Sequence, residues 1–436
     1  MKALRSNGHL PGCLAFAFVT VFGLLSSRGM AQQPGMATSH TSGPPTSLTD
    51  LIAEAEKNNP EIAAAYHGWQ AATHVPKQAS ALPETQLSIQ QFGVGSPRPF
   101  AGFSTSDFAY IGFSASQDIP YPGKRSLRGK VAGLEANSMR EDAESVRRRV
   151  IESLKVTYFQ LAYIQQTLPI IEQSDHTLNQ IEQITESHYR VGQGNQQDVL
   201  KAQLQHTRIL EEIAHHHQAE GQLQAQLKQI LNRAQTSPDI VAEPLTATPL
   251  FHTDSQLLQK VKEQSPEIRS KQQLLEQQQA RIELAHKDAR PDFMVSYMWQ
   301  HTANQFRDYY MATFGIRLPN RGRQRAELAE SEERREQVNQ QLQAERQRVA
   351  SEIQQQYVLV RTSEERLNIY KSGLIPQADA TFRAGMAAYQ SNRQDFQTLL
   401  GNFLDVLNLD LDYRQQLAEH ESAIARLERL TGEAQP

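Results

Sequence analysis

The sequence predicts a mainly helical protein in which one arrangement of helices and strands occurs twice. Long stretches carry apolar residues at every third or fourth position, which is typical of helices. Four shorter stretches alternate between apolar and polar residues, which is typical of strands. In addition, Asn59-Pro60-Glu61-Ile62 recurs as Ser265-Pro266-Glu267-Ile268. Self-similarity at such a long spacing indicates an internal duplication.

Each copy is expected to run in the order helix, strand, strand, helix, helix. A helix of about thirty residues opens each copy, with proline in its permissive first turn, and ends at Pro83 or Pro291. The last two helices of each copy are very long and are joined by a short turn. The first of them extends from about Lys124 to His188, or roughly 100 Å at 1.5 Å per residue. Pro169 and Pro376 fall inside these patterns and are expected to kink or interrupt them.

Most of the predicted helical surface is polar. Only 39% of the residues are hydrophobic and 7% are aromatic, while Gln, Glu and Arg fill the positions between the apolar ones. A narrow apolar stripe of this kind is typical of a coiled-coil seam rather than of a thick globular core. The predicted fold class is therefore mixed and mainly α, with long coiled-coil helices and four β-strands in each chain.

The N-terminus has the features of a secretory signal peptide. Lys2 and Arg5 precede the apolar run 13–25, and the small residues at 29–31 predict cleavage after Ala31. The segment 10–13 resembles a lipobox only faintly, because it precedes the apolar run. The expected divisions are a signal peptide at 1–31, a flexible leader at 32–47, a first repeat at 48–250, a second repeat at 251–430 and a tail at 431–436.

Charge and cysteine content exclude several classes of function. The net charge of −4 becomes −7 once the three bases of the signal peptide are removed, and an acidic secreted protein is a poor ligand for nucleic acid. The one cysteine also leaves with the signal peptide, so the mature chain has neither a disulfide nor a cysteine nucleophile. The sequence contains no catalytic motif such as G-x-S-x-G or H-E-x-x-H. We therefore expect neither an enzyme nor a bound cofactor.

The four alternating stretches match the pattern of membrane β-barrel strands. In such strands, apolar residues that face the lipid alternate with polar residues that face the lumen over about ten positions. A soluble, half-buried sheet is the alternative, but two hairpins behind a signal peptide, each flanked by long helices, favour the barrel. The residues assigned to the lipid-facing side are Leu87, Ile89, Ile111, Phe113, Val295, Tyr297, Trp299, Phe314 and Ile316.

Four strands are too few to close a barrel. Strands in a bilayer cannot leave an edge unpaired, and bacterial barrels begin at about eight strands. The strands of several chains must therefore be pooled, and a closed ring implies cyclic symmetry. The pattern by itself allows a dimer or a trimer.

Several motifs resemble the TolC family of outer-membrane efflux and secretion channels. They include the segment 59–62 that opens the first repeat and Gln117-Asp118-Ile119-Pro120-Tyr121-Pro122-Gly123-Lys124 after the first hairpin. The most specific is Tyr189-Arg190-Val191-Gly192-Gln193-Gly194-Asn195-Gln196-Gln197-Asp198, whose counterpart in the second repeat begins at Tyr389. The resemblance covers residues 48–430, and the segment 192–198 looks most like the branch that serves heavy-metal efflux pumps.

The resemblance implies a homotrimer in which each chain contributes four strands to one barrel in the outer membrane. The helices would continue as a hollow α-barrel across the periplasm. Two partners are also implied: a periplasmic membrane-fusion adaptor that docks at the tip of the duct, and an inner-membrane pump, expected to be of the RND type. The expected cargo is metal ions or small toxic compounds.

The resemblance places the periplasmic tip at the two turns between the long helices. The docking residues that it implies are Tyr189, Gly192, Gly194, Tyr389 and Asn392. Because Gly and Asn tolerate the left-handed conformation that such a turn needs, helix capping alone is the alternative role. The candidate gate residues are Asp198, Arg393, Asp395 and Asp405. Gln394 stands where the family pattern has an arginine that pairs with Asp198.

The run His215-His216-His217 raises the question of a metal site. Consecutive residues on a helix point in different directions, so we expect a solvated helix face, with a weak site that includes His206 as the alternative. Two other functions are considered. A periplasmic coiled-coil adaptor without a pore would need only one helical hairpin and a lipoyl-like β region. A secreted metal-binding protein would use the histidines.

Overall fold

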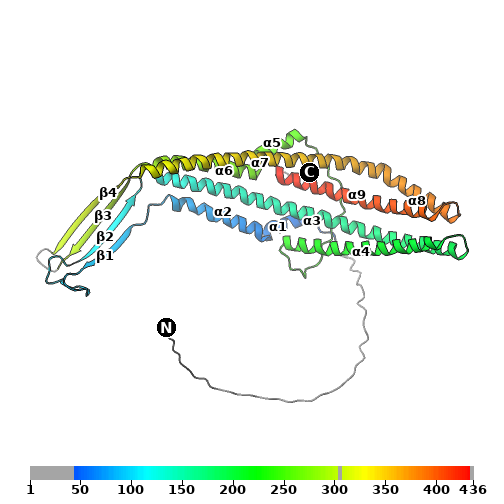
Figure 1. Ribbon diagram of the computed structural model, residues 1–436, viewed down its shortest axis with the longest axis horizontal. Coiled ribbons are helices and arrows are strands. Elements are labelled where there is room, and N and C mark those ends of the chain that lie inside the picture. The colour runs from blue at the N-terminus through cyan, green and yellow to red at the C-terminus, as the bar shows by residue number, and fades with distance from the viewer. Residues whose placement is uncertain (1–43, 303–306, 433–436) are drawn as a thin grey trace, which may run out of the picture. The chain divides into compact units, whose positions relative to one another are not determined.

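The computed structural model describes residues 44–302 and 307–432, which belong to one compact unit (Figure 1). The predicted signal peptide lies outside the described residues, as do residues 32–43 of the leader and 433–436 of the tail. The final residues of the predicted leader are fixed in place. The N–H of Thr46 donates to the Val241 carbonyl at 2.9 Å, and the Tyr158 hydroxyl donates to the Thr46 carbonyl at 2.9 Å.

The predicted order of helix, strand, strand, helix and helix is confirmed in both copies. The first copy consists of α1 (Leu48–Asn58), α2 (Pro60–Ala79), β1 (Gln86–Phe92), β2 (Tyr110–Ile119), α3 (Lys124–Arg190) and α4 (Gln196–Ile230). The second copy consists of α5 (Asp254–Gln264), α6 (Pro266–Asp288), β3 (Asp292–His301), β4 (Asp308–Arg317), α7 (Arg321–Ile369), the π-helix η1 (Tyr370–Leu374), α8 (Ile375–Gln390) and α9 (Phe396–Thr431).

The helix predicted to open at the proline of each repeated motif begins there in both copies, with Pro60 and Pro266 in its first turn, but the predicted length of about thirty residues is wrong. The helix has 20 residues in α2 and 23 in α6, and a separate helix of 11 residues precedes it in each copy. The break falls at Asn59 and at Ser265, which are extended and precede proline, a residue that disfavours the helical conformation before it. The Asn59 side chain accepts from the N–H groups of Glu61 and Ile62 at 2.9 and 3.1 Å, and so caps the second helix.

The two interior prolines have different structural outcomes. Helix α3 runs for 67 residues through Pro169, so of the two expected effects, a kink or an interruption, the interruption does not occur. In the second copy, the π-helix Tyr370–Leu374 separates α7 from α8, and Pro376 lies in the first turn of α8. The backbone stays helical through this junction, where the Ile375 N–H donates to the Tyr370 carbonyl. The π-helix therefore changes the hydrogen-bond register just before the proline, which has no N–H to donate.

The four strands form one antiparallel sheet in the order β1-β2-β3-β4. The central pairing joins β2 of the first copy to β3 of the second copy. Among the described residues, no strand pairs with the outer side of β1 or β4, so the sheet has two open edges. Such edges present rows of backbone N–H and C=O groups that are ready to pair with another chain.

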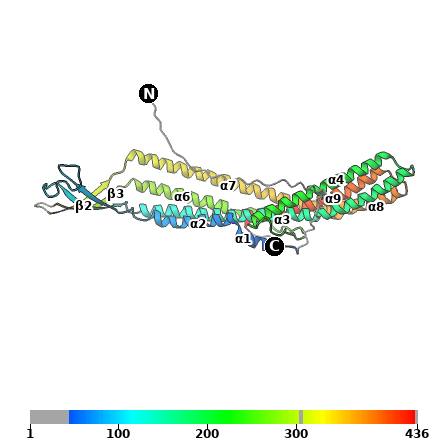
Figure 2. The same cartoon turned by 90° about the horizontal axis from the view of Figure 1, so that it is seen from below.

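The helices extend away from the sheet and divide into two sets along their length. Near the sheet, α2, α3, α6 and α7 run side by side. At the far end, α3 pairs with α4 and α8 pairs with α9, so the two turns between these helices lie together, opposite the sheet (Figures 1 and 2). None of the described helices combines the length and the apolar character that a membrane-spanning helix requires.

Two apolar clusters and one ionic cluster hold the middle of the unit together. One apolar cluster joins α5, α6, α7 and α9, and the other joins α1, α3 and α4 with the segment that follows α4. Arg429 of α9 connects three further helices: it contacts Glu152 of α3 at 2.6 Å, Glu267 of α6 at 3.1 Å, and Glu352 of α7. The Arg429 side chain is 12% exposed, so these contacts are shielded from water.

A buried lysine connects the helices to the sheet. Lys124, at the start of α3, is 2% exposed. Its Nζ donates to the Asp292 carboxylate at 2.8 Å and to the Arg290 carbonyl at 2.9 Å, just where β3 begins. The N–H of Tyr121 donates to the same Asp292 oxygen at 2.8 Å. This cluster therefore fixes the direction in which α3 leaves β2 relative to β3.

We expect Lys124→Met to lower the free energy of unfolding by about 2–3 kcal/mol, because it removes buried, charge-assisted hydrogen bonds while it keeps the apolar stem. Lys130→Met is the matched control. Lys130 makes one exposed pair with Glu283 at 3.5 Å, and its loss should cost less than about 1 kcal/mol. Thermal unfolding followed by circular dichroism in detergent measures both. Equal losses in the two variants would contradict the role of Lys124.

Candidate functional site

The turn between α3 and α4 is a Schellman motif centred on Gly192. Gly192 has φ of +74°, in the left-handed region. Its N–H donates to the Tyr189 carbonyl at 3.0 Å, and the Gln193 N–H donates to the His188 carbonyl at 2.8 Å. These two bonds satisfy the last carbonyls of α3. A Cβ on Gly194 would lie 3.2 Å from the Tyr189 nitrogen, so glycine at position 194 allows close packing of the turn.

The turn between α8 and α9 repeats this geometry with Asn392 in place of glycine. Asn392 has φ of +56°, which confirms that Asn takes the left-handed position here. Its N–H donates to the Tyr389 carbonyl at 2.9 Å, and the Arg393 N–H donates to the Ala388 carbonyl at 2.8 Å. The same backbone motif therefore occurs at both tips, in positions that correspond between the two copies.

The two corresponding tyrosines lie in different environments. Tyr189 is 46% exposed, whereas Tyr389 is 5% exposed and belongs to an apolar cluster shared by α3, α4, α8 and α9. The Tyr389 hydroxyl donates to the Thr185 hydroxyl at 3.1 Å, and its ring centroid lies 5.0 Å from that of His188. Burial raises the pKa of Tyr389 above its ordinary value. In the single chain, Tyr389 supports the tip from beneath and Tyr189 lies on its surface.

The four candidate gate residues do not form a cluster within one chain. Among the ion pairs of the described residues, none joins Asp198 to Arg393. The Nε of Arg393 instead donates to the Ser391 hydroxyl at 3.0 Å. Asp395 caps α9 and accepts from the N–H and the hydroxyl of Thr398 at 3.0 and 2.7 Å. These hydrogen bonds lower the pKa of Asp395. Asp405 is exposed on α9, roughly 15 Å further along the axis at 1.5 Å per residue.

The sequence did not predict that two amide side chains pack against Gly385, near the turn between α8 and α9. The Nε2 atom of Gln394 is buried and has no hydrogen-bond partner among the described residues. It packs against Gly385, where an added Cβ would lie 3.1 Å from Gln394 Nε2 and 2.8 Å from Asn402 Nδ2. The glycine in α8 is the only sequence signal of this contact, and a single glycine inside a helix is ambiguous.

The register of the sheet places all nine predicted lipid-facing residues on one face. Residues that pair directly across antiparallel strands point to the same side. Ile89 pairs with Phe113, Phe113 with Trp299, and Val295 with Phe314. The most exposed of the nine are Leu87 at 80%, Ile89 at 74% and Phe314 at 65%. The sheet therefore presents an apolar face that no described segment covers; its contact with lipid remains a prediction.

The opposite face of the sheet carries small polar residues together with Met294, Met298 and Met311. The hydroxyls of Ser88 and Ser114 lie 2.7 Å apart across β1 and β2, and Ser296 pairs with Thr313 across β3 and β4. The two faces therefore differ in the way that the alternating sequence pattern predicted.

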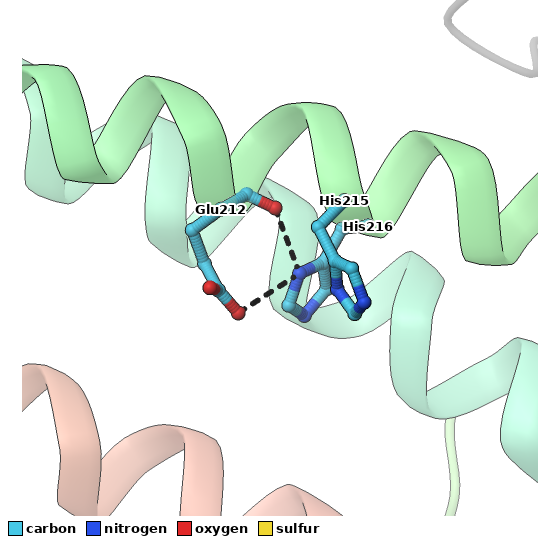
Figure 3. A group of neighbouring side chains, drawn as sticks. All are labelled: Glu212, His215 and His216. Atoms are coloured by element: carbon cyan, nitrogen blue, oxygen red, sulfur yellow. Dashed lines mark hydrogen bonds and ion pairs between the residues drawn. The ribbon is translucent and has the colours of Figure 1, made fainter.

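Of the three consecutive histidines, His215 and His216 lie close to Glu212, whereas His217 does not. One ligand atom from each of Glu212, His215 and His216 lies within 4.8 Å of the other two (Figure 3). Glu212 lies three and four residues before His215 and His216 on the same face of α4, which brings their ligand atoms close together. The expectation of a solvated helix face without a metal stays a prediction. His217 points to Glu220 instead, at 3.9 Å, and so lies apart from this group.

His206 lies apart from this group. It contacts Asp175 at 3.1 Å and Glu182 at 3.8 Å on α3, so the predicted alternative of a site shared with the histidine run is wrong. Sequence reasoning missed Glu212 because it considered only the histidines; the spacing of Glu212, His215 and His216 was the available signal.

The sequence profile of the family described as outer membrane efflux protein matches residues 51–233 and 257–432. This chain belongs to that family. The two matched segments correspond to the two copies in the structure, which confirms the internal duplication. None of the curated proteins compared with the chain matches it.

Solved structures of outer-membrane channels have the same fold. The outer-membrane channel OprN aligns with a TM-score of 0.77 and 16% identity over 89% of this chain and 91% of its own. CusC aligns with a TM-score of 0.76 and 16% identity over 88% and 91%. The outer membrane protein VceC from Vibrio cholerae aligns with a TM-score of 0.76 and 17% identity over 89% and 97%.

As a member of this family, the protein is an outer-membrane efflux channel whose helices extend into the periplasm, and it acts in transport rather than in catalysis. Channels of this kind work in tripartite efflux systems. The family assignment excludes the alternatives of a coiled-coil adaptor without a pore and of a secreted metal-binding protein.

The different burial of the two tip tyrosines gives a direct test of the tip structure. We expect Tyr389→Ala to destabilise the tip by about 3 kcal/mol, because it empties a buried aromatic site, and Tyr389→Phe to cost about 1 kcal/mol for the lost hydrogen bond. Tyr189→Ala is the matched control and should change stability by less than about 0.5 kcal/mol. Hydrogen exchange of residues 375–407 measures the effect. Equal protection in the two alanine variants would contradict the assignment.

Proposed function

We propose that this efflux channel is a homotrimer in which β4 of one chain pairs with β1 of the next, so that three sheets close one transmembrane barrel. The observation that carries the proposal is a four-stranded sheet with two open edges and one exposed apolar face. Unpaired backbone groups are too costly in lipid for such a sheet to be inserted alone. Pairing the last strand of each chain with the first strand of its neighbour is a head-to-tail contact, which closes under cyclic symmetry.

The periplasmic adaptor is proposed to dock on the two tip turns. Tyr189, Gly192 and Asn392 are exposed there, and Gly194 permits the compact shape of the first turn. Tyr389 contributes by holding α8 against α3 through Thr185 rather than by touching the partner. Because both tips have the same backbone motif, the adaptor meets two similar surfaces on each chain.

For the pump and the cargo, the segment 192–198 supports an RND-type system of the heavy-metal branch, which exports metal ions or small toxic compounds. Overall likeness does not separate the branches, because CusC and OprN both align at 16% identity. The turn motif alone carries this part of the proposal.

The gate is proposed to depend on contacts between chains at the tips. Asp198 and Arg393 are not paired to each other within one chain, so each is available to a neighbour at the constricted end. Charges in a narrow constriction are screened less than charges on an open surface. Asp395 already caps α9, and its removal would cost about 1 kcal/mol of helix stability, which makes it a poor reporter of gating.

The mass of the detergent-solubilised particle tests the proposed trimeric barrel. We expect it to correspond to three chains. Phe314→Arg should reduce the yield of that particle in the outer membrane, with a cost of about 2–4 kcal/mol if residue 314 lies near the bilayer midplane. Thr313→Arg is the matched control and should be milder because it lies on the polar face. A folded monomer that is stable without detergent would refute the proposal, and equal tolerance of both arginines would refute the assignment of the faces.

The gate is tested by conductance in planar bilayers. We expect the double variant Asp198→Ala with Arg393→Ala to conduct more than the wild type in the resting state, because the contacts that close the tips are lost. The control is Asp379→Ala with Arg383→Ala, which removes the same two charges from an exposed pair at 2.8 Å on α8. Wild-type conductance in the first variant, at unchanged trimer yield, would show that these two residues do not hold the gate.

A further inference from the structure

Helix α4 brings a carboxylate and two imidazoles together outside the tip turns and the sheet. Glu212, His215 and His216 are spaced so that His215 and His216 lie three and four residues after the acid, on one face of the helix. One ligand atom from each residue lies within 4.8 Å of the other two (Figure 3). Only modest side-chain movement is needed for all three to reach one ion, because metal–ligand bonds are about 2 Å long.

The second observation concerns the buried histidine. His216 is 4% exposed, and its Nε2 atom is buried without a hydrogen-bond partner among the described residues. Its Nδ1 atom lies 3.0 Å from the Glu212 carbonyl oxygen and 3.3 Å from a Glu212 carboxylate oxygen. Since a carbonyl oxygen can only accept, Nδ1 carries a proton, and in the neutral ring Nε2 is the nitrogen with the lone pair. Metal-ligating histidines commonly have this arrangement, with one nitrogen held by a carbonyl and the other free to bind.

The surroundings also favour a cation. The ring of Tyr163 on α3 lies 6.3 Å from that of His216. Glu212 on α4 and Asp412 and Glu419 on α9 all act electrostatically on Tyr163. Acidic side chains of two helices therefore lie near Tyr163, the ring that neighbours His216. The Glu212 side chain is 47% exposed, which leaves a path for an ion from the solvent.

We propose that Glu212, His215 and His216 bind one divalent transition-metal ion per chain, with water completing its coordination. Two imidazoles and a carboxylate without any thiolate suit Zn²⁺, Ni²⁺ or Cu²⁺. They do not suit Cu⁺, which prefers sulfur ligands, or Mg²⁺ and Ca²⁺, which prefer oxygen ligands. The site depends on neither the proposed cargo nor the gate, because its three ligands lie within one helix.

The test uses Zn²⁺ alone, added to the untagged, detergent-solubilised full-length channel and followed by equilibrium dialysis. Co²⁺ then serves as a spectroscopic probe of the ligands. We expect one saturable site per chain in the wild type. His215→Ala and His216→Ala should each weaken it by about tenfold or more, since even residues behind the ligands typically have effects of this size. His217→Ala is the matched control and should bind as the wild type does, because His217 lies apart, beside Glu220.

His215 is exposed, so its replacement should leave the fold intact even if that of His216 does not. Circular dichroism and trimer yield establish the folded state of each variant. Three results would each overturn the proposal: no saturable Zn²⁺ binding by the wild type, unchanged binding by His215→Ala, or an equal loss in His217→Ala. A failure of trimer assembly would instead count against the proposed barrel, because the three ligands belong to a single helix.

Discussion

The open edges of a four-stranded sheet constrain the rest of this molecule. The outer backbone groups of β1 and β4 have no strand beside them among the described residues, and one face of the sheet is apolar and exposed. A chain with this sheet cannot satisfy its hydrogen bonds in lipid alone. The duplication answers part of the problem, because β2 of the first copy pairs with β3 of the second and halves the number of open edges that two separate hairpins would have.

The two copies share a backbone arrangement, but the side chains at corresponding positions lie in different environments. Both tips end in a left-handed residue, but Tyr189 is exposed while Tyr389 is packed against Thr185 and His188. The long helices that follow the strands differ too: α3 contains Pro169 without an interruption, whereas a π-helix precedes Pro376. Repetition thus determines the path of the chain, and local substitution determines which surface of each copy remains free for a partner.

Features that depend on local periodicity could be predicted from the sequence. The face of each strand follows from alternation, and the left-handed turns follow from Gly192 and Asn392, so both agree with the structure. Burial of Tyr389 could not be predicted, because it depends on Thr185, a residue 204 positions away. The start of the opening helices at Pro60 and Pro266 was predicted, but the short helix before each was missed, because Asn59 and Ser265 both end that helix and cap the next one. The grouping of Glu212 with two histidines depends on rotamers, which spacing alone does not determine.

Packing at the tips bears on how the proposed gate could move. One apolar cluster contains Ile181 of α3, Ala202 of α4, Tyr389 of α8 and Phe403 of α9, so all four tip helices of a chain share one core. Separating the two hairpins of one chain would expose this core, at a cost of about 25 cal/mol for each Å² of apolar surface. In the proposed trimer, neighbouring chains would meet through the outer, polar faces of the same helices, where the single chain has no such core. If the proposed gate lies at the tips, we expect the tip of each chain to move as one unit relative to its neighbours. Asp198 and Arg393, which do not pair with each other within one chain, are therefore the better candidates for the closing contacts.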